Sequence, residues 1–308
     1  MTQQMSNAAL HRNGVGASCV GTPPGSYPSL LAFLAQRFPT IAQDEWIARL
    51  SRGDVLSESG TPFALNAPYP PASKVYYFRA LAAERRIPFE AVVLFEDEFI
   101  VVADKPHFLP VVPSGKYLQE TLLVRLKRQL GIDTLAPVHR IDRDTAGLVL
   151  FTKQPATRGA YQALFRERLV HKEYEAIAPF NAALHFPLTR ATRMASSEEF
   201  MCMIEVPGEP NAITRIELLE SRGARARYKL LPATGQRHQL RVHMNALGLP
   251  IENDEIYPAL LPEIPDDDAA WQARYARPLK LLAKVLAFTD PITGMERRFE
   301  SVRRLEFD

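Results

Sequence analysis

The order of strand-like and helix-like segments after residue 90 constrains the fold more than any other feature of the sequence. Apolar or alternating runs typical of strands follow one another mostly through turns, as in VVLFEDEFIVVADKP, AGLVLFTK, HKEYEAIA and RARYKLLPATG. Amphipathic patterns typical of helices fall among them at irregular intervals, namely LQETLLVRLKRQLG, QPATRGAYQALFRERL and QRHQLRVHMNALG. A doubly wound fold would need strands and helices to alternate regularly. The order therefore predicts an α+β fold with a mixed, mainly antiparallel sheet and flanking helices.

Changes in composition divide the chain into three parts. Residues 1–25 are rich in Ser, Gly, Asn and Pro, and we expect them to form a disordered tail. Residues 26–80 predict a small module of two helices followed by a hairpin around Gly60. Residues 90–308 hold the strand-rich pattern and predict one larger domain. Its last apolar segment, LKLLAKVLAFTDPITG, fits either a helix or a strand.

Composition and charge argue against several classes of protein. The 308 residues carry a formal net charge of +2, so a nucleic-acid partner would require a local concentration of basic residues. Cys19 and Cys202 form no C-x-x-C pair, which argues against a thiolate zinc site or a disulfide framework and fits a reducing cytoplasm. No apolar run is long enough for a membrane span, and no glycine-rich nucleotide-binding motif occurs. We therefore expect a cytoplasmic protein without a membrane span, a metal or a nucleotide cofactor.

The stretch HRIDRDTAGLVLFTK, residues 139–153, places charged residues directly before an apolar strand. Asp142 lies between Arg140 and Arg143 in the sequence, and nearby positive charge favours the ionised carboxylate. An ionised carboxylate with a lowered pKa is a poor general base, but it can act as a nucleophile or stabilise a cation. A salt-bridged turn before a strand would give the same pattern, and from the pattern alone it is the simpler interpretation.

A second candidate site surrounds TGQRHQLRVHMNALG, residues 234–248. Arg237 and Arg241 are four residues apart and predict one helix face, whereas Gln239 and His243 predict another. No acidic residue occurs between positions 221 and 251, and we call the basic residues upstream the basic stripe: Arg222, Arg225, Arg227 and Lys229. Such a stripe can bind phosphates or orient a carboxylate. A solvated basic helix and strand would show the same composition.

A third candidate is HKEYEAIA, residues 171–178. Lys172 and Tyr174 are two residues apart and predict one face of a strand. A tyrosine can stack on a flat base and offer a hydroxyl, but for an isolated tyrosine a half-buried place in the core is the better interpretation. His238 and His243 are five apart, which does not fit H-E-x-x-H, and there is no G-x-S-x-G. The sequence therefore predicts neither a zinc site nor a serine hydrolase.

Together these segments resemble the RluA-type pseudouridine synthase family. HRIDRDTAGLVLFTK resembles the family's H-R-L-D-x-x-T-S-G-L-L-L motif. Further blocks are similar to its other motifs, namely ADKPHFLPVVPSG, HKEYEAIA, LLPATGQRHQLRVHMNALGLPI and LKLLAKVLAFTDPITG. The blocks come in the family's order within residues 90–308. One such block would be moderate support, whereas an ordered set is specific.

The resemblance implies a role for each matching residue. Asp142 would be the catalytic aspartate, and Arg241 would pair with it and hold it. Tyr174 would stack on the target uracil and take part in a late proton removal. Arg140 would help fill the gap left by the flipped base, and Leu282 would pack against the pocket. The further substrate contacts predicted here are Lys172, Arg237, His238 and Gln239.

The implied reaction isomerises uridine in structured ribosomal or transfer RNA to pseudouridine. Because the net reaction is an isomerisation, it needs no redox cofactor, nucleotide or metal. The carboxylate can attack covalently or remove a ribose proton, and the sequence does not choose between these pathways. Two other classes compete with a synthase: an RNA-binding or ribosome-assembly factor without turnover, and a metal-dependent nuclease with paired carboxylates. We expect a monomer.

Two regions depart from the family pattern or match it loosely. In IENDEIYP, Asn253 precedes Asp254 where the family usually has glycine, and we assign no site to that loop. Residues 26–80 resemble a small RNA-binding module of the ribosomal-protein S-four type, with its helix–helix–G-x-V–hairpin layout. Its basic residues here are few: Arg37, Arg49 and Arg52.

Overall fold

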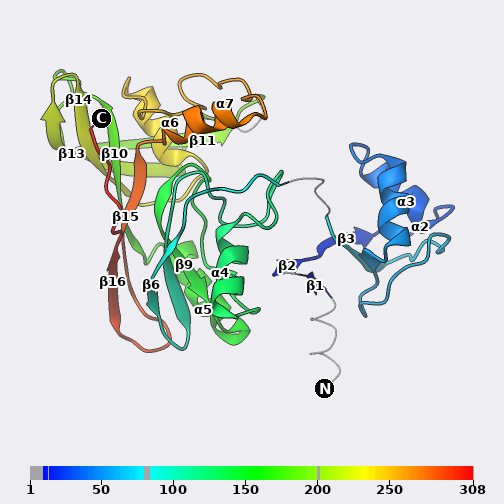
Figure 1. Ribbon diagram of the computed structural model, residues 1–308. Coiled ribbons are helices and arrows are strands. Elements are labelled where there is room, and N and C mark those ends of the chain that lie inside the picture. The colour runs from blue at the N-terminus through cyan, green and yellow to red at the C-terminus, as the bar shows by residue number, and fades with distance from the viewer. Residues whose placement is uncertain (1–9, 13, 80–83, 200–201, 308) are drawn as a thin grey trace. The chain divides into compact units, whose positions relative to one another are not determined.

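The computed structural model describes residues 10–12, 14–79, 84–199 and 202–307, and the chain divides into two compact units (Figure 1). The first unit combines the described residues up to Arg85 with Pro113–Glu120 and Val124–Asp133. The second unit consists of Arg86–Val112, Thr121–Leu123 and the chain from Thr134 onward. Most of α4 (Leu122–Leu130) therefore belongs to the first unit, although the sequence predicted it as part of the larger domain that begins at residue 90.

The first unit packs two helices on a three-stranded sheet. The helices are α2 (Leu30–Arg37) and α3 (Gln43–Ser51), and both lie where the apolar periodicity predicted them. Ser29 caps α2, because its hydroxyl oxygen accepts from the amide of Ala32 at 3.1 Å. The core of the unit is a cluster of buried apolar residues: Leu30, Phe33, Leu34, Trp46, Leu50, Val55 and Val75.

The expectation of a disordered tail over residues 1–25 is wrong for its last part. β3 (Ser18–Thr22) pairs with β5 (Ser73–Tyr77), which also pairs with β4 (Val55–Leu56). Two shorter strands precede it, β1 (His11–Arg12) and β2 (Val15–Gly16). Val20 is buried in the core of the unit. A five-residue strand of small residues carries too weak an apolar pattern to be recognised from sequence. Residues 1–9 and 13 lie outside the described part of the chain.

The few basic residues named for the module at residues 26–80 are mostly engaged inside the unit. Arg49 is buried and donates its Nε to Glu45 at 2.9 Å. The Nε of Arg52 lies 2.9 Å from an Asp54 oxygen. Of the predicted set, this leaves Arg37 as an exposed cation on the unit. The role of this unit in RNA binding stays a prediction.

The second unit is built on a mixed sheet that has eleven strands within the described residues. Its main order is β12-β11-β13-β14-β10-β15-β9-β7-β6, with β16 on β15 and β8 on β9. Among the described pairings, β15 runs parallel to β9 and the others are antiparallel, so the predicted mixed, mainly antiparallel sheet is confirmed. The strands are β6 (Val92–Glu96), β7 (Ile100–Lys105), β8 (Ala136–Pro137), β9 (Ala146–Thr152), β10 (His171–Pro179), β11 (Leu188–Ser196), β12 (Met203–Val206), β13 (Ala212–Arg222), β14 (Arg225–Pro232), β15 (Leu281–Thr289) and β16 (Glu296–Glu300).

The central strands approach closely at Gly147. This residue has φ +109°, and a Cβ there would lie 2.2 Å from the carbonyl oxygen of Ala283 on β15. That distance is well inside van der Waals contact, so glycine is required. The segment containing β15, which the sequence left open between helix and strand, is a strand. It joins the two halves of the sheet at the point where β9 begins.

Helices cover one face of this sheet. Figure 1 places α5 (Arg158–Arg166) and α6 (Gln239–Ala246) on the same side of the strands. From α5, Tyr161 and Leu164 pack against the β7–β9 region, and from α6, Leu240 and Met244 pack against the β10–β14 region. Both helices were predicted. A further helix, α7 (Asp268–Tyr275), follows the acidic segment at 263–268 and was not predicted. Within the described ranges, no helix is long and apolar enough to cross a bilayer.

Candidate active site

Asp142 lies in a loop between β8 and β9, where 28% of its side chain is exposed. The amide of Thr145 donates to the carbonyl oxygen of Asp142 at 3.2 Å and closes a turn. The buried Lys105, at the end of β7, donates its Nζ to the carbonyl oxygen of Arg143 at 2.8 Å. The loop is therefore fixed by the sheet beneath it while the carboxylate stays accessible.

Arg140 and Arg143, the sequence neighbours that were expected to keep Asp142 charged, make no ion pair with it in the structure. Arg143 turns to Asp144 instead, with its Nε 3.0 Å from Oδ1 and its Nη2 3.1 Å from Oδ2. Arg140 is exposed and makes no hydrogen bond or ion pair to any described residue. The ion-pair partner of Asp142 is Arg241, whose Nη1 lies 3.2 Å from Oδ2. Adjacent side chains of an irregular loop point in different directions, and so sequence proximity gave the wrong partners.

Arg241 is itself held by a second carboxylate, that of Asp254. Its Nε and Nη2 bind the two oxygens of Asp254 at 2.7 and 2.6 Å, a bidentate pair in which the Asp254 side chain has no exposed surface. Burial alone would lower the pKa of the Arg241 guanidinium, but the bonds to Asp254 more than offset it and the pKa is raised. The arginine thus stays charged in a buried position, with Nη1 left for Asp142.

The loop that carries Asp254 has asparagine at the position where the family usually has glycine. Asn253 takes that position with φ +62°, a region that asparagine tolerates better than other non-glycine residues. Its side chain donates to the carbonyl oxygen of Pro278 at 3.0 Å. The amides of Ile256 and Tyr257 donate to Asp254 Oδ1 at 2.8 and 3.0 Å. The sequence analysis assigned no site to this loop and so missed Asp254, which holds Arg241.

Tyr174 lies on β10 at a bulge, where the pairing with β15 shifts between Glu173 and Tyr174. Its ring packs against the core cluster beside Leu230 and Leu281, and its hydroxyl has no hydrogen-bond partner among the described residues. Burial, and then the negative charge of Asp142, raise the pKa of the phenol. At neutral pH the hydroxyl is therefore protonated and available as a donor next to the carboxylate.

The start of α6 differs from the predicted helix faces. Arg237 precedes the helix and is exposed, whereas Arg241 is buried within it, so the two arginines do not share a face. His238 caps the helix with φ +55°, and its Nε2 lies 3.9 Å from Asp142 Oδ2. Burial lowers the pKa of this histidine, which keeps the ring largely neutral beside the carboxylate.

Gln239 was predicted to contact substrate, but its amide is fully used within the fold. The carbonyl oxygen accepts from Thr234 Oγ1 at 2.7 Å and from the Gln236 amide at 3.0 Å. The amide nitrogen donates to Ile213 O at 3.0 Å and Thr214 Oγ1 at 2.9 Å. A group with all its hydrogen-bonding capacity engaged has none left for a ligand. Gln239 therefore fixes the loop before α6 rather than binding substrate.

Two further predicted residues lie on β10, the strand of Tyr174, and on its neighbour β15. Lys172 donates its Nζ to the carbonyl oxygen of Thr234 at 3.2 Å, which connects β10 to the loop before α6. Burial, and then the charge of Arg168, lower the pKa of this lysine. Leu282 is fully buried on β15 and packs with Ala146 under the loop of Asp142. It supports the floor of the site.

Comparisons with known proteins show what this chain is similar to. The profile of the family described as RNA pseudouridylate synthase matches residues 99–246, a range that includes Asp142, Tyr174 and Arg241. The dual-specificity RNA pseudouridine synthase RluA of Pasteurella multocida is 33% identical over 214 residues, which cover 67% of this chain and 90% of that protein. The chain belongs to the RNA pseudouridine synthase family.

Other relatives in this family are larger or more distant. Human pseudouridylate synthase RPUSD2 is 33% identical over 170 residues, which cover 54% of this chain but 30% of that protein. The solved structure of human RNA pseudouridylate synthase domain containing 4 superposes with a TM-score of 0.52 at 25% identity, over 70% of this chain and 88% of that one. The α+β fold is thus shared with a solved pseudouridine synthase.

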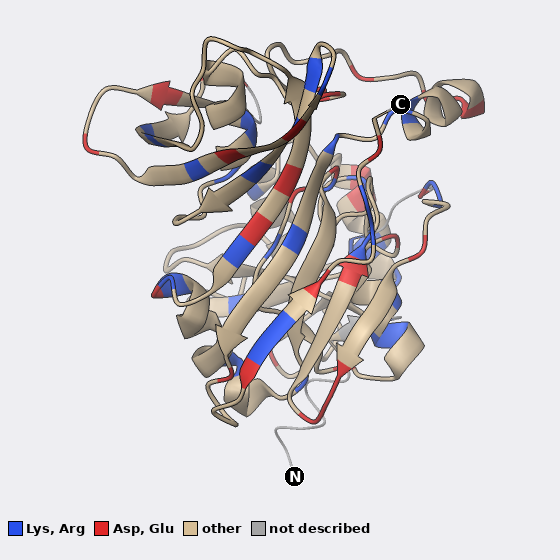
Figure 2. Cartoon of the chain, turned by 90° about the vertical axis from the view of Figure 1, so that its left-hand side faces the viewer, with Lys and Arg blue, Asp and Glu red and all other residues tan. Residues whose placement is uncertain are grey.

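The members of the basic stripe are paired with glutamates, which argues against a phosphate-binding surface there. The strands of the stripe lie on the face of the sheet seen in Figure 2, where acidic and basic residues are interleaved. Arg227, for example, binds Glu175 at 3.1 Å and Glu220 at 2.9 Å. The other members are also within 4 Å of glutamates, in the pairs Arg222–Glu220, Arg225–Glu252, Lys229–Glu173 and Lys229–Glu217. These glutamates lie outside the stretch without acids, most of them on β10 and β13, and so the absence of acids along the sequence was misleading.

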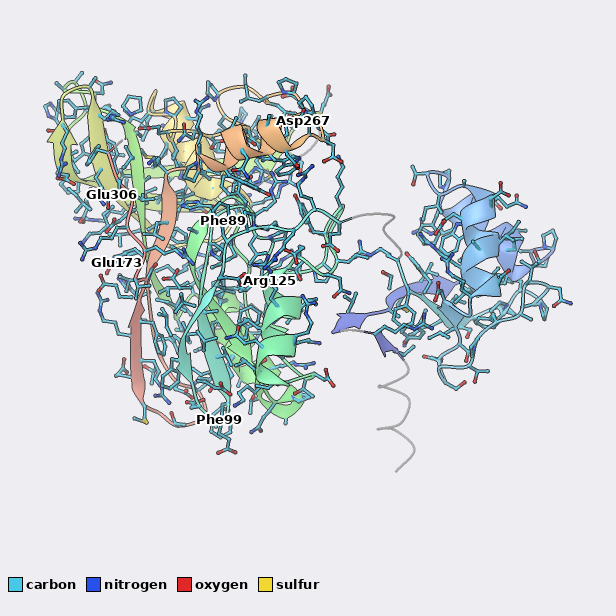
Figure 3. The ribbon with its side chains drawn as sticks, viewed as in Figure 1. Phe89, Phe99, Arg125, Glu173, Asp267 and Glu306 are labelled. Atoms are coloured by element: carbon cyan, nitrogen blue, oxygen red, sulfur yellow. The ribbon has the colours of Figure 1, made fainter. Side chains whose placement is uncertain are left out.

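Arg274 is a further residue of the site that sequence reasoning missed. It lies on α7, which begins after Asp267, labelled in Figure 3, whose side chain accepts from the Ala270 amide at 2.8 Å. The largely buried Arg274 binds Glu255 and lies 3.7 Å from Asp144 Oδ1. The segment after Asp254 is thereby tied to the loop of Asp142. No motif in the sequence signalled this contact.

Proposed function

We propose that this chain is an RNA pseudouridine synthase that isomerises one or more uridines of structured RNA, with Asp142 as the catalytic carboxylate. The observation that carries the proposal is the accessible Asp142, paired with an Arg241 that Asp254 holds from behind. The guanidinium of Arg241 places a fixed positive charge beside this carboxylate, at the site where substrate would displace water. Tyr174 lies close enough for the charge of Asp142 to raise its pKa.

The reaction breaks the bond between N1 of uracil and C1′ of the ribose and forms a bond between C5 and C1′. Asp142 either attacks covalently or removes a ribose proton, and both routes use the ionised carboxylate. The new C5–C1′ bond leaves one proton on C5 to be removed, while N1 gains one. The pKa of Tyr174 is raised, so the phenol can take the C5 proton only while passing its own proton to an acceptor such as Asp142.

The target base must leave its stack to reach Asp142, and extrusion costs a few kcal/mol. Arg140 is exposed and without a partner among the described residues, which suits a side chain that enters the gap in the RNA. The ring of Tyr174 suits stacking on the extruded uracil. Lys172 and the exposed Arg237 flank the same site and are proposed to bind the RNA backbone, in ribosomal or transfer RNA.

Site-resolved pseudouridine mapping tests this function. Total ribosomal and transfer RNA would be mapped from cells that lack the gene and are complemented with wild type, Asp142→Asn or Asp133→Asn. Asp133 is an exposed acid that precedes β8, outside the loop of Asp142, and serves as the matched control. A site restored by wild type and Asp133→Asn but not by Asp142→Asn supports the proposal. Restoration by Asp142→Asn would refute the role of that carboxylate.

A purified-protein assay separates turnover from binding. Wild-type protein and Asp142→Asn would be incubated with unmodified ribosomal and transfer RNA transcripts, and both retention of RNA and pseudouridine content would be measured. Turnover by wild type with RNA binding by both proteins is the expected result. Binding by both without turnover by either would favour an RNA-binding or ribosome-assembly factor on a synthase fold.

A further inference from the structure

Arg168 follows α5 in a backbone conformation that favours glycine. Its φ is +60°, the amide of Leu169 donates to Leu164 O at 2.8 Å, and its own amide donates to Phe165 O at 3.3 Å. This pair of bonds is the Schellman ending of a helix, in which the residue at the position of Arg168 is most often glycine. An arginine there is strained, and its side chain makes no hydrogen bond or ion pair with a described residue in return. A residue with a strained backbone and no compensating interaction inside the protein is a candidate for contact with a ligand.

The charge of Arg168 is also uncompensated. Its side chain is exposed and makes no hydrogen bond or ion pair to any described residue. Leu169 and Val170 alone separate Arg168 from β10, and the second residue of that strand is another cation, Lys172. Burial and then the charge of Arg168 lower the pKa of Lys172. Lys172 donates to the neutral carbonyl oxygen of Thr234 at 3.2 Å, and no carboxylate pairs with it among the described residues. Two like charges held together are unfavourable until an anion binds.

Arg166, two residues earlier, gives the contrast. It is also basic, exposed and at the end of α5, but it lies in the helix and binds Glu167 at 3.1 Å. Both arginines interact favourably with the helix dipole, so the dipole does not account for the difference between them. What distinguishes Arg168 is its proximity to Lys172 and to the strand that carries Tyr174.

We propose that Arg168 and Lys172 together bind one phosphate of the substrate RNA, next to the nucleotide that enters the pocket of Asp142 and Tyr174. Lys172 and Tyr174 are two residues apart on β10, a separation of about 7 Å along a strand. This is close to the length of one nucleotide, so a phosphate at Lys172 adjoins a base held at Tyr174. The guanidinium of Arg168 would add charge-assisted hydrogen bonds from the exposed side. The inference rests on the proposed function.

Substitution of Arg168 by glycine tests the phosphate contact, because glycine relieves the backbone while removing the charge. The variants Arg168→Gly, Arg168→Lys and the control Arg166→Ala would be compared with wild type. The probe is an unmodified RNA transcript that carries a uridine converted by wild type. Affinity would be measured from low to high salt, together with kcat, KM and the midpoint of thermal unfolding.

For Arg168→Gly we expect an unchanged or higher unfolding midpoint, an affinity about three- to tenfold weaker, and a salt dependence flatter by about one unit. KM should rise while kcat at saturation stays near wild type. Arg168→Lys should recover much of the affinity, and Arg166→Ala should bind nearly as wild type does. A structural role for Arg168 could not raise stability while weakening binding.

Either of two results overturns this inference alone, provided that wild type converts uridine. One is an Arg168→Gly protein with wild-type affinity and salt dependence. The other is an equal loss in Arg166→Ala, which would mean that any positive charge at this helix end contributes. A wild-type protein that converts uridine in no ribosomal or transfer RNA would instead overturn the proposed function, and the phosphate assignment with it.

Discussion

Replacement of Asp254 by asparagine should strongly destabilise the larger unit, because it breaks the buried pair that holds Arg241. The two side chains are 0% and 3% exposed, and the carboxylate binds two guanidinium nitrogens and two backbone amides. Removal of one partner from a buried pair costs about 3–5 kcal/mol. Asparagine keeps an oxygen for the amides of Ile256 and Tyr257 but turns a donor toward Arg241. We therefore expect a loss near the lower end, about 3 kcal/mol.

The measurement is the midpoint of thermal unfolding, followed by circular dichroism. A loss of about 3 kcal/mol corresponds to roughly 6–12 °C for a unit of this size. The matched control is Asp142→Asn, which removes a carboxylate from the same arginine at a site that is 28% exposed and should cost less than about 1 kcal/mol. If Asp254→Asn is no less stable than Asp142→Asn, then Asp254 does not anchor the arginine and the account of the site is wrong.

Three further substitutions test other contacts. Burial lowers the pKa of Lys105 to about 7, well below that of an unfolded lysine, so between these values the native state binds fewer protons and its stability rises with pH. The difference in unfolding free energy between wild type and Lys105→Met should therefore shift in favour of wild type from pH 6.5 to pH 9.5 (about 3 pH units). Urea unfolding at each pH measures both free energies, and the same pH dependence in the two proteins would contradict the lowered pKa. Gly147→Ala would place a Cβ 2.2 Å from Ala283 O and should lower the unfolding free energy in urea by more than about 3 kcal/mol. The control Gly223→Ala, at φ +61° with open space around the added Cβ, should lower it by about 1 kcal/mol. Equal losses in the two variants would show that the sheet relaxes around the added methyl group. Tyr174→Phe keeps the ring and should bind RNA as wild type does while turnover falls by about 100-fold or more, and normal turnover would exclude the hydroxyl from proton transfer.

Elements with a strong apolar period were predictable from the sequence, and weakly patterned elements were not. β9 is buried at every position, and α5 buries Tyr161 and Leu164 on one face, so both stood out. β11 reads LTRATRMAS and is mostly exposed or half-buried, which leaves no apolar alternation to detect. It is held in the sheet by its pairing with β12 and β13, and such long-range contacts leave no local signature.

The residues of the candidate site were likewise predictable only where they lie in a recognisable motif. Asp142, Tyr174 and Arg241 lie in recognisable motifs, and the structure brings Arg241 to Asp142 across 99 positions of the chain. Asp254 was missed because Asn253 replaces the glycine that marks its loop, although asparagine can adopt the same backbone conformation. Gln239 was misassigned because a motif residue that stabilises a loop cannot be told by sequence from one that binds substrate. Residue type alone does not show which hydrogen bonds are already used.

The place of β15 in the sheet has a consequence for the timing of synthesis. This strand lies between β10 and β9, although it is encoded after all but β16 of the other strands. Until the ribosome has released Leu281–Thr289, the two halves of the sheet have open edges, and the floor beneath Asp142 is missing. A nascent chain that still lacks β15 therefore cannot act on the RNA around it. Activity should begin abruptly, when the last strands close the sheet, rather than growing with chain length.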